Sequence, residues 1–279
     1  MKNRELHTLL FLCLCTSLFA QNRSYIFSAL TKADGLPNCT FKTTLMDKKG
    51  FIWFGAEDRL IRWDGRHTKE FVTIQDDSTS LSFTYIKDLL EDIDGTIWVA
   101  TIGGGVCQFD PKTQRFKRFM YDAHNPHTIS DPNVWKLFLD SQNVLWLGTF
   151  DGGLSRFNRQ TKTFDRFPLV KNLKNIEEAF KRNTVLDIAE DVSNPNIFWL
   201  GTNEGIVRFE KSSGTVRLFS PPKTEGQTVF SVVMDAPNEL WVGTYGSGIA
   251  RFDIQTFKWT YFKAHTEGGD KVEGFGQYY

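Results

Sequence analysis

The stretch DSQNVLWLGTFDGGLSRF, residues 140–157, contains the sequence pattern that decides the fold of this chain. It runs from an aspartate through an Asn turn into an apolar strand around Trp146, and then through a Gly-rich turn into a short alternating strand that ends at Phe157. Gly and Asn adopt positive φ more readily than other residues, so they favour tight turns between strands. The stretch therefore predicts antiparallel strands joined by hairpins.

The same pattern occurs five times in the chain. Its tryptophans are 45, 48, 53 and 42 residues apart, close to the roughly 40–50 residues of a four-stranded propeller blade. One more short strand follows each copy, and sheets of this kind bury their aromatic faces by stacking against one another. We predict an all-β fold, a β-propeller of about five four-stranded blades, because the alternative, a β-sandwich, would not repeat one signature. The repeats are marked by Trp53, Trp98, Trp146, Trp199 and Trp241.

The chain begins with the features of an exported protein. Lys2 and Arg4 precede an apolar run, residues 9–20, that is shorter than the roughly 20 residues of a membrane-spanning helix. We interpret residues 1–20 as a secretory signal peptide, residues 21–263 as the propeller domain, and residues 264–279 as a tail that starts a truncated repeat. We therefore expect a periplasmic protein with no membrane span in this chain.

Three local expectations complete the outline of the fold. Residues 170–182 have apolar side chains at helical spacing, which predicts a short amphipathic helix, and residues 25–30 read as a strand. The fifth repeat already supplies its own fourth strand at residues 256–262, so the strand at 25–30 has no partner there and we expect an open arc, the N-terminal piece of a larger protein. Once the signal peptide is removed, Cys39 and Cys107 remain, and we expect both to be reduced.

The charge balance and the motifs exclude several classes of function. Lys and Arg total 33 and Asp and Glu total 33, so the chain has no net charge with which to attract nucleic acid. The sequence contains no phosphate-binding loop, no His-Glu-x-x-His zinc motif and no Gly-x-Ser-x-Gly elbow. His124 and His127 lie close together but lack a third metal ligand at useful spacing. We therefore expect no catalytic residue, no metal and no cofactor.

The residues of this pattern, as they stand in Asp140 to Phe167, resemble the two-component regulator propeller repeat. The resemblance extends from Tyr25 to about Lys263, although Ala56 and Ala100 replace the Thr and Gly that the family has at these positions. It implies the periplasmic sensor region of hybrid two-component regulators of the Bacteroidetes type, whose ligands are typically glycan fragments. The partner that it implies is a small molecule such as an oligosaccharide. It does not indicate an oligomeric state.

Relatives of this kind, like propellers in general, bind ligands at loops that enter the innermost strand and at loops that join the second strand to the third. Residues there vary in this chain while their framework repeats, so they have no shared packing role. The alternative is that they are ordinary exposed loop residues. The ligand-binding candidates are Lys87, Trp135, Phe150, Asn203, Phe230 and Tyr245.

Two other classes of function stay open at this point. A propeller lyase or glycosidase would need convergent carboxylates, and Asp88 and Asp187, near the starts of innermost strands, are the one pair that the sequence offers. A protein–protein interaction module would bind a partner protein and no small ligand. We prefer the non-enzymatic sensor.

Overall fold

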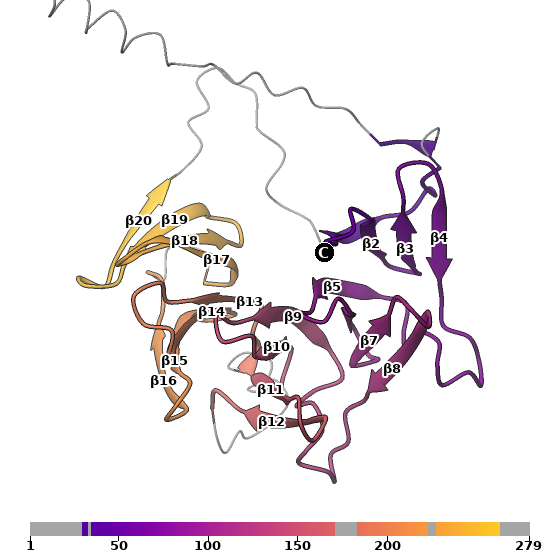
Figure 1. Ribbon diagram of the computed structural model, residues 1–279. Helices are drawn as coiled ribbons and strands as arrows, with labels where there is room; N and C mark the ends of the chain where they lie inside the picture. The colour runs from indigo at the N-terminus through magenta and orange to yellow at the C-terminus, as the bar shows by residue number, and fades with distance from the viewer. Residues whose placement is uncertain (1–29, 33–34, 171–182, 223–226, 263–279) are drawn as a thin grey trace, which may run out of the picture. The chain divides into compact units, whose positions relative to one another are not determined.

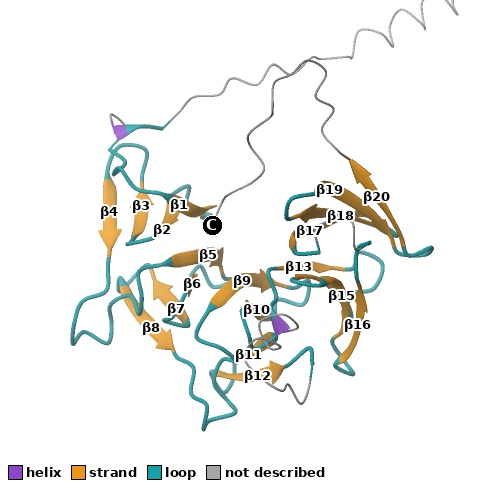
Figure 2. Cartoon of the chain, turned by 180° about the vertical axis from the view of Figure 1, so that it is seen from behind, coloured by secondary structure: helices purple, strands orange, loops and turns teal. Residues whose placement is uncertain are grey.

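The computed structural model describes residues 30–32, 35–170, 183–222 and 227–262 (Figure 1, Figure 2). The chain divides into two compact units, Met1–Leu36 and Pro37–Tyr279, and every strand named below belongs to the second. The signal peptide and the tail at 264–279 lie outside the described residues, and so do the strand at 25–30 and the helix at 170–182, apart from Leu30 and Val170. These four assignments therefore stay predictions.

In the described parts of the chain, twenty strands form five four-stranded antiparallel sheets, and in each sheet the strands follow one another in chain order. The first sheet comprises β1 (Phe41–Met46), β2 (Ile52–Ala56), β3 (Leu60–Trp63) and β4 (Thr68–Phe71). The second comprises β5 (Ile86–Glu91), β6 (Ile97–Thr101), β7 (Val106–Asp110) and β8 (Arg115–Phe119), and the third β9 (Val134–Leu139), β10 (Leu145–Thr149), β11 (Leu154–Asn158) and β12 (Thr163–Phe167). The fourth comprises β13 (Asp187–Glu190), β14 (Ile197–Thr202), β15 (Gly205–Glu210) and β16 (Thr215–Phe219). The fifth comprises β17 (Val229–Ala236), β18 (Glu239–Thr244), β19 (Gly248–Asp253) and β20 (Lys258–Phe262).

Neighbouring sheets pack side by side through their innermost strands. Strand β5 contacts both β1 and β9, and β13 contacts both β9 and β17. Figure 1 shows these innermost strands toward the middle of the arc, with the fourth strand of each sheet toward the outside. The five four-stranded sheets confirm the all-β propeller prediction. Within the described residues the first and fifth sheets do not join, so the sheets do not close into a ring.

A repeated aromatic contact holds each pair of neighbouring sheets together. The tryptophan of one sheet packs against the third-strand phenylalanine of the next, with ring centroids between 5.0 and 6.2 Å apart. The four pairs are Trp53–Phe109, Trp98–Phe157, Trp146–Phe209 and Trp199–Phe252. These tryptophans are at most 1% exposed, as core packing requires. The expectation that all five are core residues is corrected at Trp241, which is only half-buried because no described sheet follows the fifth.

The repeat aspartate stabilises both its own hairpin and this core. In the first four sheets the tryptophan Nε1 donates to the aspartate Oδ2 at 2.7–3.0 Å, which satisfies a buried indole donor. The pairs are Trp53–Asp47, Trp98–Asp92, Trp146–Asp140 and Trp199–Asp191. The other carboxylate oxygen accepts amides of the turn, as when Asp47 Oδ1 accepts from the backbone of Lys49 and Phe51. The Asp-to-Trp spacing is thus set by one carboxylate that bonds in two directions.

The two cysteines of the described chain are free thiols, as the sequence predicts. Cys107 is buried, and its Sγ lies 3.0 Å from Ser82 Oγ. Burial raises the pKa of the Cys107 thiol, so it stays protonated and unreactive at neutral pH. Among the described residues, no helix is long and apolar enough to cross a membrane.

Candidate ligand-binding face

The topology places the predicted ligand-facing positions at one end of each sheet. In each sheet the start of the innermost strand pairs with the end of the second strand. The loop that enters the innermost strand is therefore adjacent to the turn that follows the second strand. The pairs that fix this arrangement are Phe41–Ala56, Ile86–Thr101, Val134–Thr149 and Val229–Thr244. We call this end of the sheets the loop-entry end.

A β-bulge interrupts four of the innermost strands at the loop-entry end. The unpaired extra residue is a predicted candidate in three of them, Lys87, Trp135 and Phe230, and Lys42 in the first sheet. A bulge releases a residue from the ladder and re-aims its side chain, and bulges are common beside functional sites. The innermost strand of the fourth sheet begins one residue later, at Asp187, and its residue at this position, Leu186, is buried. In the fourth sheet this position therefore belongs to the core.

Three predicted residues meet at the boundary between the second and third sheets. Trp135 and Phe150 stack with ring centroids 5.4 Å apart and an angle of 18° between their planes. The Nζ of Lys87 lies 3.7 Å from the centre of the Trp135 ring, a cation–π contact of about 0.5–2 kcal/mol. The ammonium therefore covers one face of Trp135. A sugar ring would reach that face only by displacing Lys87.

The charge of Lys87 is poorly compensated. Burial lowers the pKa of the Lys87 ammonium, and the positive charge of Lys42 lowers it further. Lys42 is paired with Glu57 at 2.8 Å, whereas Lys87 has no ion-pair partner among the described residues. An ammonium in this setting can donate hydrogen bonds to a hydroxyl, carbonyl or carboxylate oxygen.

Phe230 and Tyr245 form a second aromatic group, in the fifth sheet. Their ring centroids are 5.9 Å apart at an angle of 64°, an edge-to-face contact. Phe230 is 42% exposed and Tyr245 is 54% exposed, so both rings present apolar surface to solvent. The Tyr245 amide donates to the carbonyl of Thr228 at 2.9 Å, which ties the two loops together. Here the aromatic faces are open, in contrast to Trp135.

Asn203 lies at the loop-entry end of the fourth sheet, in the turn between β14 and β15. It is half-buried between Thr202 and Glu204, and the Glu204 amide donates to Thr202 Oγ1 at 3.2 Å. The structure thus brings together Lys87, Trp135 and Phe150, and separately Phe230 and Tyr245, whereas Asn203 belongs to a different sheet from either group.

Two carboxyl groups beside Phe150 were not foreseen from the sequence. Asp131 lies in the loop that enters β9, and Asp151 follows Phe150 directly. Burial raises the pKa of Asp131, the charge of Asp151 raises it further, and burial also raises the pKa of Asp151. Asp151 Oδ1 is buried without a hydrogen-bond partner in the described structure. The sequence feature that could have indicated Asp151 is its position directly after Phe150, a variable aromatic residue.

Charged side chains occupy the next position of the innermost strands β5, β9 and β13, one residue after the variable position. Lys136 lies between the two carboxylates of the enzyme hypothesis, with its Nζ 3.9 Å from Asp88 Oδ2 and 3.1 Å from Asp187 Oδ1. Both carboxylates also accept a backbone amide of a neighbouring innermost strand, Leu137 for Asp88 and Val232 for Asp187, each at 2.9 Å. These contacts connect successive sheets. They give both aspartates a structural role.

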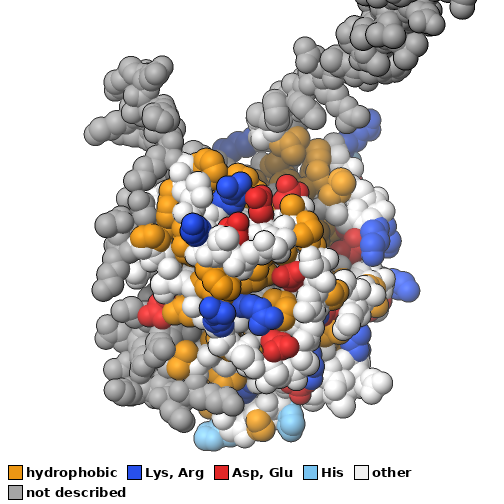
Figure 3. All heavy atoms as spheres, turned by 90° about the vertical axis from the view of Figure 1, so that its left-hand side faces the viewer, with side chains coloured by type: hydrophobic (Ala, Val, Ile, Leu, Met, Phe, Trp, Pro, Cys, Tyr) orange, Lys and Arg blue, Asp and Glu red, His pale blue; other side chains and the backbone are white. Residues whose placement is uncertain are grey.

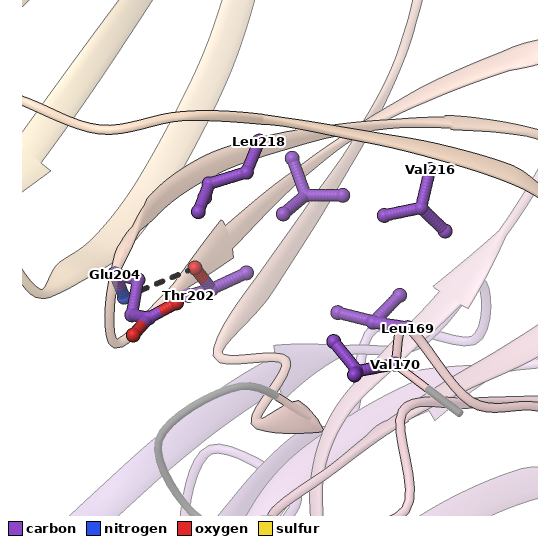
Figure 4. Close-up of a pocket in the computed structure, with 7 residues that line it drawn as sticks. Leu169, Val170, Thr202, Glu204, Val216 and Leu218 are labelled. Atoms are coloured by element: carbon purple, nitrogen blue, oxygen red, sulfur yellow. Dashed lines mark hydrogen bonds between the residues drawn. The ribbon is translucent and has the colours of Figure 1, made fainter. Parts of the chain in front are cut away.

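A small pocket lies beside the Asn203 turn (Figure 4). Its volume is about 190 Å³, below the roughly 300 Å³ at which ligand pockets begin. It is lined by Leu169, Val170, Thr202, Glu204, Val207, Val216 and Leu218. None of the six predicted ligand-binding residues lines it, and the described chain contains no group of three or more His, Cys, Asp or Glu side chains that could hold a metal.

The fold and this end of the sheets define a class: a repeat β-propeller whose variable residues gather at the loop-entry end. The two component regulator propeller family model matches residues 80–103 and 128–151, which include Lys87, Trp135 and Phe150. These two matched segments are similar to two-component regulator propeller repeats. Over 74 residues the chain is 38% identical to Histidine kinase P4 of Formosa agariphila, a match that covers 26% of this chain and 5% of the kinase.

Solved structures share the fold. The extracellular domain of a putative hybrid two component system from B. thetaiotaomicron superposes with a TM-score of 0.71 and 23% identity, covering 85% of this chain and 32% of that one. The extracellular domain of a putative one component system from the same organism gives a TM-score of 0.65 and 20% identity, covering 84% and 32%. The chain thus spans about a third of the length of these two domains.

Proposed function

We propose that this chain is a periplasmic ligand-sensing propeller module of a two-component signalling protein, and that it recognises a glycan fragment or a similar nutrient. The observation that carries the proposal is the set of bulges at the loop-entry end, which turn Lys87, Trp135 and Phe230 out of a ladder that is otherwise repeated. The likeness to two-component regulator propellers supports the signalling role and the extracellular location.

The chemistry of the face suits a carbohydrate. Exposed rings such as Tyr245 and Phe230 can stack against the C–H face of a sugar, while Lys87 can donate and Asp151 can accept hydrogen bonds from hydroxyl groups. The module itself performs no reaction in this proposal, because Asp88 and Asp187 are engaged with Lys136 and with backbone amides.

Isothermal titration calorimetry of the purified mature chain against a panel of oligosaccharides tests the proposal. We expect binding that weakens at least about tenfold in Tyr245→Ala or Lys87→Ala, the loss of roughly 1.4 kcal/mol. Ile93→Ala is the matched control, because Ile93 is 51% exposed, close to the 54% of Tyr245, but lies in the β5–β6 hairpin at the opposite end. A folded protein that binds no member of the panel would contradict the proposal.

The same preparations distinguish the two rival functions. Release of shorter sugars that disappears in Asp88→Asn would favour a propeller lyase or glycosidase. Recovery of one defined partner protein, with no sugar binding, would favour an interaction module. Mass spectrometry of the secreted protein tests the export step, since we expect the mature N-terminus at Gln21.

A further inference from the structure

The bulge residues of the first three sheets follow one another across the loop-entry end. They are Lys42 in β1, Lys87 in β5 and Trp135 in β9, and each is the residue that the pairing of its strand leaves out. Strand β5 contacts both β1 and β9, and the Nζ of Lys87 lies 3.7 Å from the centre of the Trp135 ring. Two ammonium groups and one indole ring therefore occupy the same position in three successive sheets.

The lysines of the neighbouring innermost strands are compensated within the chain. Lys42 Nζ pairs with Glu57 Oε1 at 2.8 Å, and Lys136 Nζ lies 3.1 Å from Asp187 Oδ1. Lys87 is half-buried between these two strands, and among the described residues it has no ion-pair partner. The three lysines thus differ in one respect, which is the carboxylate that Lys87 lacks.

Asp88 follows Lys87 directly but is engaged elsewhere. Its Oδ1 accepts the Leu89 amide at 3.0 Å, and its Oδ2 accepts the Leu137 amide at 2.9 Å. Burial lowers the pKa of the Lys87 ammonium most, the charge of Lys42 lowers it further, and the charge of Asp88 raises it by less. Lys87 is therefore a partly desolvated cation whose two nearest charges sum to a repulsion. An anion beside its Nζ would offset both effects.

The surroundings of Trp135 favour the same kind of ligand. Lys87 covers one face of this ring, so a neutral sugar could stack there only by removing the ammonium from a cation–π contact. An anionic group can bind Lys87 while the ammonium stays over the ring. The carboxyl groups of Asp131 and Asp151 lie beside Phe150 and form no ion pair with Lys87 in the described structure, and burial, which raises the pKa of each, disfavours their charged form.

The charges of the whole chain favour local recognition over a general attraction for polyanions. Lys and Arg total 33, as do Asp and Glu. Figure 3 shows the side of the molecule that carries the fourth and fifth sheets, where basic and acidic side chains are interspersed. Long-range attraction is weak when the two signs are mixed, so an anion gains most from direct contact with one uncompensated cation.

We propose that the ligand of the loop-entry end carries an anionic group, a carboxylate or a sulfate, and that Lys87 binds this group. The inference rests on the proposed function and narrows its ligand to an acidic sugar, with a uronate or a sulfated residue as the two sources of the charge. Lys87 is then the residue that distinguishes acidic from neutral sugars.

Matched pairs of oligosaccharides test the inference by titration calorimetry of the purified mature chain. One arm compares trimers of galacturonate, mannuronate and glucuronate with their methyl esters, which remove the carboxylate charge and keep the sugar. The other arm compares sulfated galactan disaccharides with their desulfated forms. We expect at least one acidic member to bind, and its neutral counterpart to bind at least about tenfold more weakly. The arm that shows this difference identifies the anionic group.

Variants of Lys87 assign the preference to its ammonium. Lys87→Met keeps a long apolar side chain over Trp135 but removes the charge, so it should bind the acidic member at least about tenfold more weakly and no better than the neutral one. Lys87→Arg keeps the charge and should keep most of the preference. Lys49→Met is the matched control, because it removes one exposed lysine from the β1–β2 hairpin at the opposite end and should change neither affinity. Lys87→Gln provides a second neutral variant if Lys87→Met does not fold.

Two results overturn the inference and leave the proposed function standing. The first is a neutral counterpart that binds as tightly as the acidic member. The second is a folded Lys87→Met protein that keeps the wild-type preference for the acidic member, which would mean that another cation holds the anion. A folded chain that binds no oligosaccharide of either arm, nor any of the wider panel, contradicts the proposed function itself, and the inference fails with it.

Discussion

Arg159 donates to both carboxylate oxygens of Asp92, at 2.8 and 2.6 Å, although the two residues belong to successive sheets and are 67 positions apart. Asp92 is fully buried and also accepts Trp98 Nε1 at 2.7 Å. One carboxylate thus connects its own hairpin, its own tryptophan and the next sheet. In the described structure Asp191 has no such cation, since Ile254 occupies the position of Arg159 in the fifth sheet.

Asp92→Asn should therefore destabilise the chain more than Asp191→Asn. The first change leaves Arg159, which is 30% exposed, without its buried counter-charge, and we expect a loss of about 2–3 kcal/mol in the free energy of unfolding. The second leaves one oxygen acceptor, so either the turn amides or Trp199 Nε1 loses its partner, but no cation is left unpaired, and it should cost about 1–2 kcal/mol. Urea unfolding at pH 7 measures both. Equal losses would show that the Arg159 contact contributes no stability.

The contribution of Asp92 should also disappear in acid. Burial opposes its ionisation, but the hydrogen bonds from Arg159 and Trp98 outweigh burial and hold the pKa of Asp92 below its usual range. A carboxyl whose pKa is lower in the folded chain contributes stability above its unfolded pKa, about 3.9, and loses it as pH falls through the folded value. The stability difference between wild type and Asp92→Asn should be full at pH 7 and shrink below about pH 4. A difference that stays constant down to pH 3 would contradict this assignment.

Asp88 should behave in the opposite sense. Burial is the largest influence on it and raises the pKa of its carboxyl, despite the nearby Lys136. A raised pKa means that the folded chain holds the proton more tightly, so stability falls as pH rises through the folded value. Asp88→Asn, which keeps an acceptor for the Leu137 amide, should gain stability relative to wild type as the pH rises above the unfolded pKa of about 3.9. Unfolding curves at several pH values measure the trend, and a relative loss on raising the pH would exclude it.

The repeated core could be predicted from the sequence because the same position of each repeat has the same packing role. The tryptophan at each repeat is buried by the next sheet, so its recurrence revealed both the strand and its packing. The exception, Trp241, could not be recognised from its own repeat, since that repeat is as regular as the others. Its exposure depends on whether another sheet packs against the fifth.

The candidate site could be predicted only as a set of positions. The sequence indicated Lys87 and Trp135 as variable residues, but their contact joins two repeats and depends on how neighbouring sheets pack. The bulges could not be predicted either, because a bulge is a property of the register between two strands, and the strand sequences alone leave that register open. The same holds for Asp131 and Asp151, whose raised pKa values arise from burial in the folded chain.

Gly201→Ala should destabilise the contact between the fourth and fifth sheets. A Cβ atom at Gly201 would lie 2.7 Å from the Val229 carbonyl oxygen, a backbone atom that cannot turn away, so we expect a loss of about 1–3 kcal/mol in the free energy of unfolding. Gly243→Ala is the matched control at the same position of the fifth sheet, where the nearest atom is the movable Ser231 Oγ. Thermal unfolding compares the two. A smaller effect for Gly201→Ala than for Gly243→Ala would show that the fourth and fifth sheets separate easily.

Trp146→Ala and Trp241→Ala should differ sharply although they change the same repeat position. Trp146 is 1% exposed, packs against Phe209 of the next sheet and donates to Asp140, so its loss should cost about 3–5 kcal/mol. Trp241 is half-buried and packs against Phe262 of its own sheet, so its loss should cost about 1–2 kcal/mol. Urea unfolding measures both, and Trp146→Phe and Trp241→Phe provide a milder pair if Trp146→Ala does not fold. Equal costs would mean that Trp241 is covered in solution as completely as Trp146.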